Sequence, residues 1–225
     1  AKLLLDEKGI KDGVTIKIRK YIPVAAGMAG GSTDAAAVLV GVNRMFDLGF
    51  TKKELMERGV KLGADVPYCI MRGTALSEGI GEILTELPAP PQCHLVIAKP
   101  QISVSTKAVY GKLRVNELAP EEHPDIDGMM AAIKNGDLDG VIERLGNVLE
   151  TVTVPDHPEI ARIKEMMMEN GACGSLMSGS GPTVFGIYKD RELAEKACQA
   201  LREADGGRLT RQVYLTEFYN RKKAR

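Results

Sequence analysis

Small residues fill the stretch Gly27-Met28-Ala29-Gly30-Gly31-Ser32-Thr33-Asp34, which joins a strand-like run to an alanine-rich helix. A glycine loop that ends on a helix N-terminus lets backbone N–H groups approach an anion closely, and the positive end of the helix dipole adds to the attraction. The stretch therefore predicts a phosphate-binding loop. It lacks the glycine-lysine-serine/threonine ending of a P-loop and the glycine spacing of a dinucleotide-binding turn. A small-residue turn that lets the helix pack tightly against a sheet is the alternative interpretation.

The segments on either side of this loop carry periodic apolar residues. Upstream, apolar side chains alternate at period two over residues 14–19, which is typical of a half-buried strand. Downstream, apolar residues recur on one side of a helix over residues 35–46. Thr51 is followed three places later by Glu54, and this capping box predicts a second helix near residues 51–60.

Farther along the chain, apolar runs separated by glycine and proline predict alternating strands and helices. A buried strand is expected at Tyr68–Met71, paired across Arg72-Gly73 with a strand at Thr74–Ser77. The other expected strands are 94–98, 175–177, 183–188 and 212–216, and the other expected helices lie near 105–113, 127–134, 137–149, 158–169 and 192–203. This order predicts an α+β fold in which a few antiparallel strands are covered by helices.

Composition limits the class of protein. The chain has 225 residues, enough for one large domain or two small ones, and its 30 basic and 30 acidic residues cancel. No global field therefore steers it toward nucleic acid or an anionic membrane. No apolar run is long enough to span a bilayer, and the four cysteines and three histidines are too scattered for a metal site. We expect a cytoplasmic protein with reduced thiols and no metal-ligating cluster.

Asp65 is the candidate catalytic residue. It lies between Gly63 and Pro67, directly after an expected helix. A carboxylate held there can accept the proton of a substrate hydroxyl as that hydroxyl attacks phosphorus. The alternative is a turn aspartate that accepts hydrogen bonds from nearby backbone amides.

A second glycine loop, Ser178-Gly179-Ser180-Gly181-Pro182, separates two expected strands. Two residues suffice for a hairpin turn, so small residues at all five positions indicate a loop pressed against a ligand or against the first loop. Tyr110 could stack on a base, although a core tyrosine is the default interpretation. The run Met166-Met167-Met168 lies in an expected amphipathic helix and predicts core packing combined with surface exposure.

Taken together, these motifs resemble the GHMP kinase superfamily, which includes galactokinase, homoserine kinase, mevalonate kinase and phosphomevalonate kinase. Its phosphate-loop signature is similar to Ile22-Pro23-Val24-Ala25-Ala26-Gly27-Met28-Ala29-Gly30-Gly31-Ser32-Thr33-Asp34-Ala35-Ala36-Ala37. Its C-terminal glycine motif is similar to Met177-Ser178-Gly179-Ser180-Gly181-Pro182-Thr183-Val184-Phe185. The strings 62–67 and 77–82 resemble the branch of the superfamily that acts on 4-diphosphocytidyl-2-C-methyl-D-erythritol. The resemblance covers essentially the whole chain.

The resemblance implies a fold and an activity. The fold would be α+β and GHMP kinase-like. Residues 1–76 would form a partial ATP-binding domain like ribosomal protein S5 domain 2, and residues 77–225 a ferredoxin-like C-terminal domain. The activity would be phosphorylation, with ATP and Mg²⁺, of the 2-hydroxyl of the cytidine-linked methylerythritol in non-mevalonate isoprenoid biosynthesis. The partner would be this small molecule, with no nucleic acid or membrane, and the protein would be a monomer or homodimer.

Family roles carry over to the matching positions. The ATP phosphates would be bound by Pro23-Val24-Ala25-Ala26-Gly27-Met28-Ala29-Gly30-Gly31-Ser32-Thr33, with hydroxyls offered by the last two. Asp65 would be the catalytic base. Gly179, Ser180 and Gly181 would shape the loop beside the substrate, and Tyr110 would stack on the cytosine. The alternatives are another superfamily kinase, of mevalonate or homoserine type, and a non-catalytic nucleotide-binding module.

One departure from the family concerns the start of the chain. Family members begin with a strand bearing an alanine-lysine-isoleucine-asparagine motif, followed by an aspartate-glycine-tyrosine-histidine motif, and neither is found in this sequence. The lysine that assists the catalytic aspartate, and the tyrosine and histidine that hold cytidine, would lie there. The apolar helical stripe Ala1-Lys2-Leu3-Leu4-Leu5 also begins without a cap. We therefore expect the sequence to be a fragment.

Overall fold

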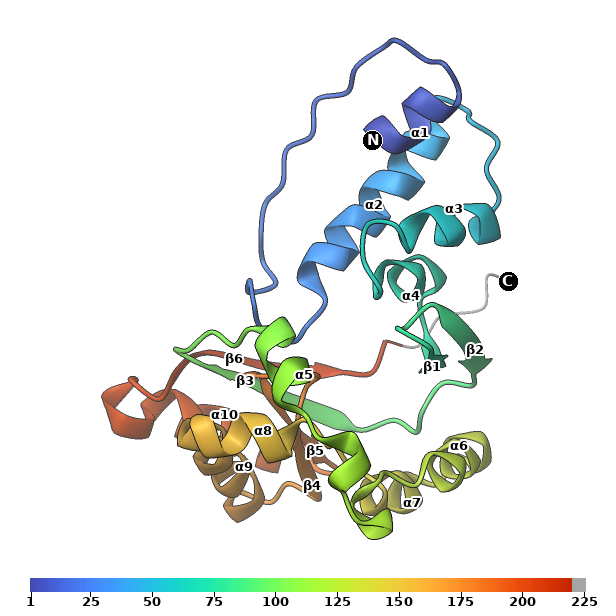
Figure 1. The fold of residues 1–225 in the computed structure, drawn as a ribbon. Helices are drawn as coiled ribbons and strands as arrows, with labels where there is room; N and C mark the ends of the chain where they lie inside the picture. Colours follow the sequence, from blue (N-terminus) through green and yellow to red (C-terminus); the bar gives the residue numbers. More distant parts are fainter. Residues whose placement is uncertain (220–225) are drawn as a thin grey trace. The chain divides into compact units, whose positions relative to one another are not determined.

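Two sets of elements, each with its own hydrophobic core, make up the computed structural model, which describes residues 1–219 (Figure 1). The N-terminal unit comprises Ala1–Val24 and Ala29–Leu87. The C-terminal unit comprises Ala25–Met28 and the chain from Pro88 onward. The domain boundary expected after residue 76 stays a prediction.

The N-terminal unit is mainly helical. Its elements are α1 (Lys2–Glu7), α2 (Gly30–Met45), α3 (Lys52–Gly59), α4 (Val66–Met71) and an antiparallel hairpin of β1 (Thr74–Glu78) and β2 (Ile83–Leu87). The helix expected after Thr51 is confirmed together with its cap. The Thr51 hydroxyl accepts the Glu54 N–H at 3.2 Å, and the Glu54 carboxylate accepts the Thr51 N–H at 2.8 Å. The core of this unit is formed by Leu4, Leu5, Ala36, Leu39, Val42, Leu48, Phe50, Leu55, Val66 and Ile70.

The strand expected over residues 14–19 is not formed. Residues 10–21 run between α1 and α2 without regular structure, and no strand of the described chain pairs with them (Figure 1). Ile16 and Ile18 are 46% and 60% exposed. Alternating apolar residues give a stable strand only where neighbouring strands pair with its backbone and another layer covers its apolar face. The alternating apolar pattern of residues 14–19 is therefore not sufficient to form a strand.

The strand expected at Tyr68–Met71 is also wrong, because this run is helix α4. Asp65 is the N-cap residue and Pro67 lies in the first turn, where a fixed φ and a missing N–H favour a helix. A short apolar run is compatible with either structure, so these flanking residues decide between them. Residues 74–77 are a strand as expected, but β1 pairs with β2 and not with residues 68–71.

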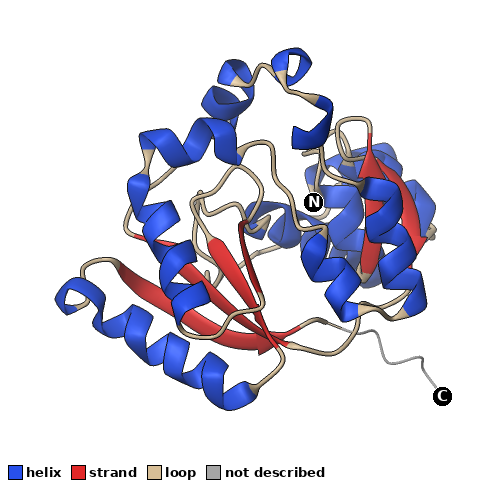
Figure 2. Ribbon diagram, turned by 90° about the horizontal axis from the view of Figure 1, so that it is seen from below, coloured by secondary structure: helices blue, strands red, loops and turns tan. Residues whose placement is uncertain are grey.

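The C-terminal unit is built on one antiparallel sheet. Its strands are β3 (His94–Pro100), β4 (Gly174–Met177), β5 (Val184–Tyr188) and β6 (Thr210–Glu217), in the order β4-β5-β3-β6. Helix α9 (Pro158–Glu169) packs on β4 and β5, and α10 (Arg191–Glu203) packs on β3 and β6. Figure 2 shows these strands as a single sheet with helices beside it. The chain order strand-helix-strand-strand-helix-strand gives the expected ferredoxin-like arrangement.

The remaining helices connect β3 to α9. They are α5 (Thr106–Lys112), α6 (Ile126–Asn135), α7 (Leu138–Glu143) and α8 (Glu150–Asp156), with single-turn helices at Val115–Glu117 and Pro120–Glu122. A third single-turn helix, Ala204–Gly206, lies between α10 and β6. The helix expected over residues 137–149 ends at Glu143, and α8 was not expected. Asn147 interrupts the helical pattern because its side chain binds backbone groups outside any helix.

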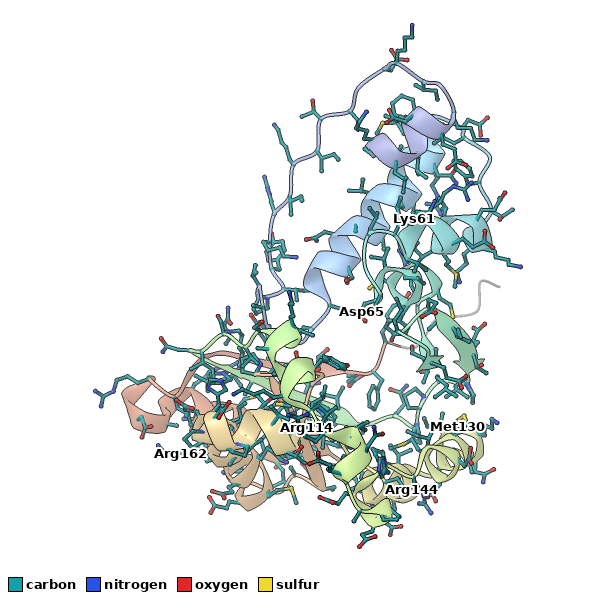
Figure 3. All side chains as sticks on the ribbon, viewed as in Figure 1. Lys61, Asp65, Arg114, Met130, Arg144 and Arg162 are labelled. Atoms are coloured by element: carbon teal, nitrogen blue, oxygen red, sulfur yellow. The ribbon has the colours of Figure 1, made fainter. Side chains whose placement is uncertain are left out.

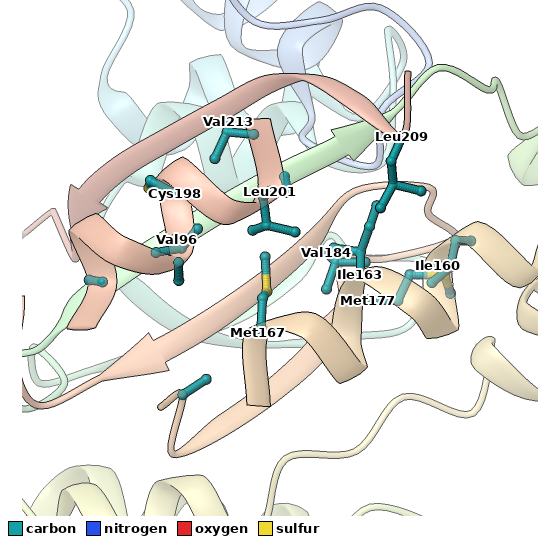
Figure 4. Close-up of a cluster of buried hydrophobic side chains, with 14 of the residues drawn as sticks. Val96, Ile160, Ile163, Met167, Met177, Val184, Cys198, Leu201, Leu209 and Val213 are labelled. Carbon is teal, nitrogen blue, oxygen red and sulfur yellow. The ribbon is translucent and has the colours of Figure 1, made fainter. Parts of the chain in front are cut away.

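Met167 lies at the centre of the larger core (Figure 4). It is fully buried on the side of α9 that faces the sheet, among Val184, Tyr188 and Leu201 of the same cluster. Its neighbour Met168 is 48% exposed. The expected combination of core packing and surface exposure in the methionine run is therefore confirmed.

Met167→Ala is expected to lower the free energy of unfolding by about 2–5 kcal/mol, because it removes buried methylene and sulfur contacts and leaves a cavity. Met168→Ala, on the exposed face of the same helix turn, is expected to change it by less than about 0.5 kcal/mol. Urea denaturation of both variants measures the difference. Equal losses would show that the face of α9 assigned to the core is wrong.

Candidate active site

In the first glycine loop, every second residue from Ala25 to Ala29 has the left-handed backbone conformation, with a positive φ. Ala25, Gly27 and Ala29 have φ values of 51°, 67° and 47°. For alanine this conformation costs on the order of 1–3 kcal/mol, and such strain persists where the surrounding structure enforces it, often at functional sites. Turns of this kind can direct successive N–H groups toward one anion. The loop therefore has a backbone suited to phosphate.

Gly27 is pressed against the second glycine loop, in the C-terminal unit. The Ser178 hydroxyl donates to the Gly27 carbonyl at 2.8 Å. A Cβ on Gly27 would lie 2.3 Å from the Ser178 carbonyl oxygen and 3.0 Å from that of Gly181. No side chain fits at this contact, so glycine is required by both φ and space. The expectation that the second loop is pressed against the first is confirmed.

The first turn of α2 leaves three amides available. Ala29 is the N-cap residue but offers no side-chain cap, and the N–H groups of Gly30, Gly31 and Ser32 donate to no atom of residues 1–219. Only Thr33 is bonded locally, with its N–H and hydroxyl both donating to the Ala29 carbonyl at 2.9 and 3.0 Å. Unpaired amides at the positive end of a helix form an anion site.

The two glycines of this turn have different surroundings. A Cβ on Gly30 would lie 2.8 Å from Ile22 Cγ2, so packing inside the protein explains that glycine. A Cβ on Gly31 would meet no atom within 4 Å, and Gly31 has no positive φ. No contact or backbone angle in the described chain requires glycine at position 31. A phosphate that approaches the free amides closely would require it.

Lys20 is a site residue that the sequence interpretation missed. Its ammonium pairs with the Asp34 carboxylate on the first turns of α2, and it would lie 3.2 Å from a Cβ on Gly30. The Lys20 ammonium, paired with this carboxylate, therefore lies close to the free amides. A lysine three residues before Pro23, directly ahead of the loop, was the available signal.

Asp65 lies in the turn between α3 and α4 (Figure 3). Its backbone carbonyl accepts the Cys69 N–H at 3.1 Å, but its exposed carboxylate accepts no hydrogen bond from the described residues. This contradicts the alternative of a turn aspartate that binds nearby amides. The carboxylate is free to accept a proton from a ligand.

Contacts on both sides of Asp65 bring its turn to the first turn of α2. The Thr33 hydroxyl oxygen lies 3.5 Å from Cys69 Sγ, and the Ser32 hydroxyl oxygen lies 4.0 Å from the position of a Cβ on Gly63. The carboxylate and the free amides therefore belong to one region of the N-terminal unit. Burial raises the pKa of the Cys69 thiol above its ordinary value, so it stays a thiol and is a poor nucleophile.

The predicted substrate residues lie together in the C-terminal unit. The Thr106 hydroxyl at the start of α5 is 2.9 Å from the Ser180 hydroxyl, which joins the helix of Tyr110 to the second loop. Tyr110 is 61% exposed, so it is not a core tyrosine and its ring can receive a ligand. Gly179 and Gly181 have φ values of 56° and 84°, and Ser180 is buried.

Two other classes of feature are absent from residues 1–219. No group of three or more histidine, cysteine, aspartate or glutamate side chains there is arranged to hold a metal ion. No helix there combines the length and apolar character that crossing a bilayer needs.

Comparison with known proteins decides the family. The model described as GHMP kinases N terminal domain matches residues 1–73, and the one described as GHMP kinases C terminal matches residues 129–206. A protein of Lachnospira eligens named 4-diphosphocytidyl-2-C-methyl-D-erythritol kinase is 54% identical over 217 residues, covering 96% of this chain and 74% of the relative. The protein of that name from Lachnoclostridium phytofermentans is 52% identical over 221 residues, covering 98% and 74%. The chain belongs to the GHMP kinase family.

Solved structures agree with this assignment. A crystal structure of 4-(cytidine 5'-diphospho)-2C-methyl-D-erythritol kinase has a TM-score of 0.78 and 30% identity, covering 96% of this chain and 75% of that one. Homoserine kinase from Cytophaga hutchinsonii has a TM-score of 0.80 at 22% identity, covering 94% and 72%, which supports the fold. The GHMP kinase α+β fold is therefore confirmed, and as a member of this family the chain is a small-molecule kinase that uses ATP.

Gly31→Ala is expected to weaken binding of a nonhydrolysable ATP analogue by about tenfold or more, because the new methyl group disturbs hydrogen bonds to a charged phosphate. The same change should leave the fold intact or stabilise it by up to about 1 kcal/mol, since alanine favours a helix. Calorimetric titration and thermal denaturation measure the two effects.

Gly41→Ala is the matched control, because Gly41 lies in the same helix and its Cβ would also meet nothing within 4 Å. It should stabilise α2 without changing nucleotide affinity. If both variants bind the analogue as the wild type does, no phosphate approaches the helix closely enough to require glycine at position 31.

Proposed function

We propose that this GHMP kinase transfers the γ-phosphoryl group of ATP to the 2-hydroxyl of 4-diphosphocytidyl-2-C-methyl-D-erythritol, a step of non-mevalonate isoprenoid biosynthesis. The observation that carries the proposal is identity of about half the residues, over nearly the whole chain, with relatives named as kinases of that compound. The chain spans about three quarters of the length of those relatives.

The N-terminal unit supplies the groups for nucleotide binding and proton transfer. The free amides of Gly30, Gly31 and Ser32, with the ammonium of Lys20, suit the negative charge of the ATP phosphates. The proposed phosphate loop runs from Pro23 to Thr33, and the hydroxyls of Ser32 and Thr33 are further donors. These amides are fixed before the nucleotide arrives, so they need not reorganise as charge develops.

Asp65 acts as the general base in this proposal. Its carboxylate takes the proton of the 2-hydroxyl while that oxygen bonds to the γ-phosphorus. The bond between phosphorus and the β–γ bridging oxygen breaks, and ADP leaves with the electron pair. A carboxylate without hydrogen bonds from the described residues is available for this step.

The acceptor is recognised by residues of the C-terminal unit. We propose that Tyr110 stacks on the cytosine, since its ring is exposed and α5 is fixed to the second loop through Thr106. Gly179, Ser180 and Gly181 would shape the loop beside the acceptor, with two residues in the left-handed conformation.

Three finer features belong to the same proposal. Mg²⁺ would be held largely by the nucleotide phosphates, as is common for this ion, and would neutralise their charge. A cytoplasmic location fits the four free cysteines, because thiols stay reduced there. The protein would work as a monomer or homodimer on a small-molecule substrate.

Asp65→Asn in the full-length protein is expected to lower kcat by about 10²–10⁴-fold while leaving ATP-analogue affinity unchanged, because the amide cannot accept the proton. Asp12→Asn, an exposed aspartate of the same unit, is the control and should behave like the wild type. Steady-state kinetics and titration of both variants test the role. Unchanged turnover in Asp65→Asn would show that Asp65 is not the general base.

The acceptor is tested separately. With ATP, the full-length protein should phosphorylate 4-diphosphocytidyl-2-C-methyl-D-erythritol and give no comparable turnover of mevalonate or homoserine. Coupled detection of ADP measures all three rates. Turnover of mevalonate or homoserine alone would reject this acceptor in favour of another member of the family. Nucleotide binding without turnover of any of the three would favour a non-catalytic module.

A further inference from the structure

The second glycine loop is held by a short segment of the same unit, Asn147–Thr153, which we call the cradle. The Asn147 amide nitrogen donates to the Met177 carbonyl at 2.9 Å and to the Gly179 carbonyl at 2.8 Å. One side chain thus fixes two carbonyls that lie two residues apart. Two such bonds set the orientation of the peptide groups between them, including that of Ser178.

The cradle is itself rigidly placed. The Asn147 side-chain oxygen accepts the Leu149 N–H at 3.0 Å. The Glu150 carboxylate accepts the Met177 N–H at 2.7 Å and pairs with the Lys164 ammonium. Met177 is therefore held at both its N–H and its carbonyl, and its side chain lies in the core (Figure 4).

The far end of the cradle completes the support. The buried Thr153 hydroxyl donates to the Ser180 carbonyl at 3.3 Å. The cradle thereby uses the carbonyls of Met177, Gly179 and Ser180. The N–H groups of Gly179 and Ser180, in contrast, donate to no atom of the described chain, so they are available to an anionic ligand.

The same loop orders the phosphate loop through Gly27. The Ser178 hydroxyl donates to the Gly27 carbonyl, and the Ser178 carbonyl oxygen lies 2.3 Å from the position of a Cβ on Gly27. A change in the peptide groups at residues 177–179 would therefore displace Gly27. Asn147 can therefore influence the phosphate loop at Gly27, a residue of its own unit.

We propose that Asn147 is a positioning residue that holds the second glycine loop so that its amides stay available to a phosphate and Gly27 keeps its place. The inference rests on the proposed nucleotide binding. This role requires an amide side chain, because the Asn147 NH₂ group donates two hydrogen bonds to carbonyls while the side-chain oxygen accepts a third. Aspartate has the same shape but, when ionised, has no proton to donate and would repel the two carbonyls.

The test compares Asn147→Asp with Asn170→Asp in the full-length protein. Asn170 is the matched control, since its half-buried amide donates to a backbone carbonyl, that of Met166, at 2.7 Å and lies at the end of α9. Asn147→Asp should weaken binding of a nonhydrolysable ATP analogue by about tenfold and raise the KM of the acceptor. Asn170→Asp should change neither the analogue affinity nor the KM of the acceptor, even if it lowers Tm by as much as Asn147→Asp does.

The pH dependence provides a second readout. The two facing carbonyls should raise the pKa of the introduced carboxyl above its ordinary value of about 4 by more than the single Leu149 N–H lowers it. Once protonated, this carboxyl donates one hydrogen bond again. The affinity of Asn147→Asp relative to the wild type should therefore recover partly as pH falls from 7 toward 5, and that of Asn170→Asp should not change. A loss of packing alone would give no such recovery.

Equal analogue affinities for Asn147→Asp, Asn170→Asp and the wild type would overturn the proposal. If Asn147→Asp does not fold, Asn147→Ser, which adds no charge, is measured in its place. If neither folds while Asn170→Asp does, Asn147 serves the fold as a whole and the positioning role is rejected. A wild type that binds the analogue but does not phosphorylate the cytidine compound would reject the proposed acceptor and leave the comparison of affinities valid.

Discussion

Three backbone amides at the start of α2 have no partner in the described chain, and the proposed binding of the ATP phosphates depends on them. A helix N-terminus normally satisfies such groups with a side-chain cap or water, but Ala29 offers no side-chain cap. In α3, by comparison, Thr51 and Glu54 complete a capping box. At the start of α2 a phosphate can take the place of such a cap.

The left-handed residues before α2 make this arrangement possible and have an energetic cost. Ala25 and Ala29 adopt a conformation that glycine would adopt at less cost. The conformation is stabilised by contacts at both ends: Gly27 is seated on Ser178, and Ala29 accepts two hydrogen bonds from Thr33. The Asn147 cradle extends this support into the C-terminal sheet. Binding groups on a loop are thus fixed by rigid elements, which reduces the ordering needed when a ligand binds.

The sequence predicted most of the C-terminal unit, since its strands and helices have strong periodicity and clear stops. It failed where an element depends on a partner. Residues 14–19 have a strand pattern but no strand beside them, and residues 68–71 form a helix because of Asp65 and Pro67. The two glycine loops and Asp65 could be proposed as site residues from the sequence because each lies within a contiguous motif. Lys20 was missed because its role arises from a contact with α2, and Asn147 because its partners lie 30 and 32 residues away.

The most direct test of the central claim is to follow the backbone amide resonances of Gly30, Gly31 and Ser32 by NMR during titration with a nonhydrolysable ATP analogue. We predict that these amides show the largest shift changes in the N-terminal unit and become protected from hydrogen exchange, because the phosphates accept hydrogen bonds from them. Saturation of the protein by the analogue with these three resonances unmoved would contradict it.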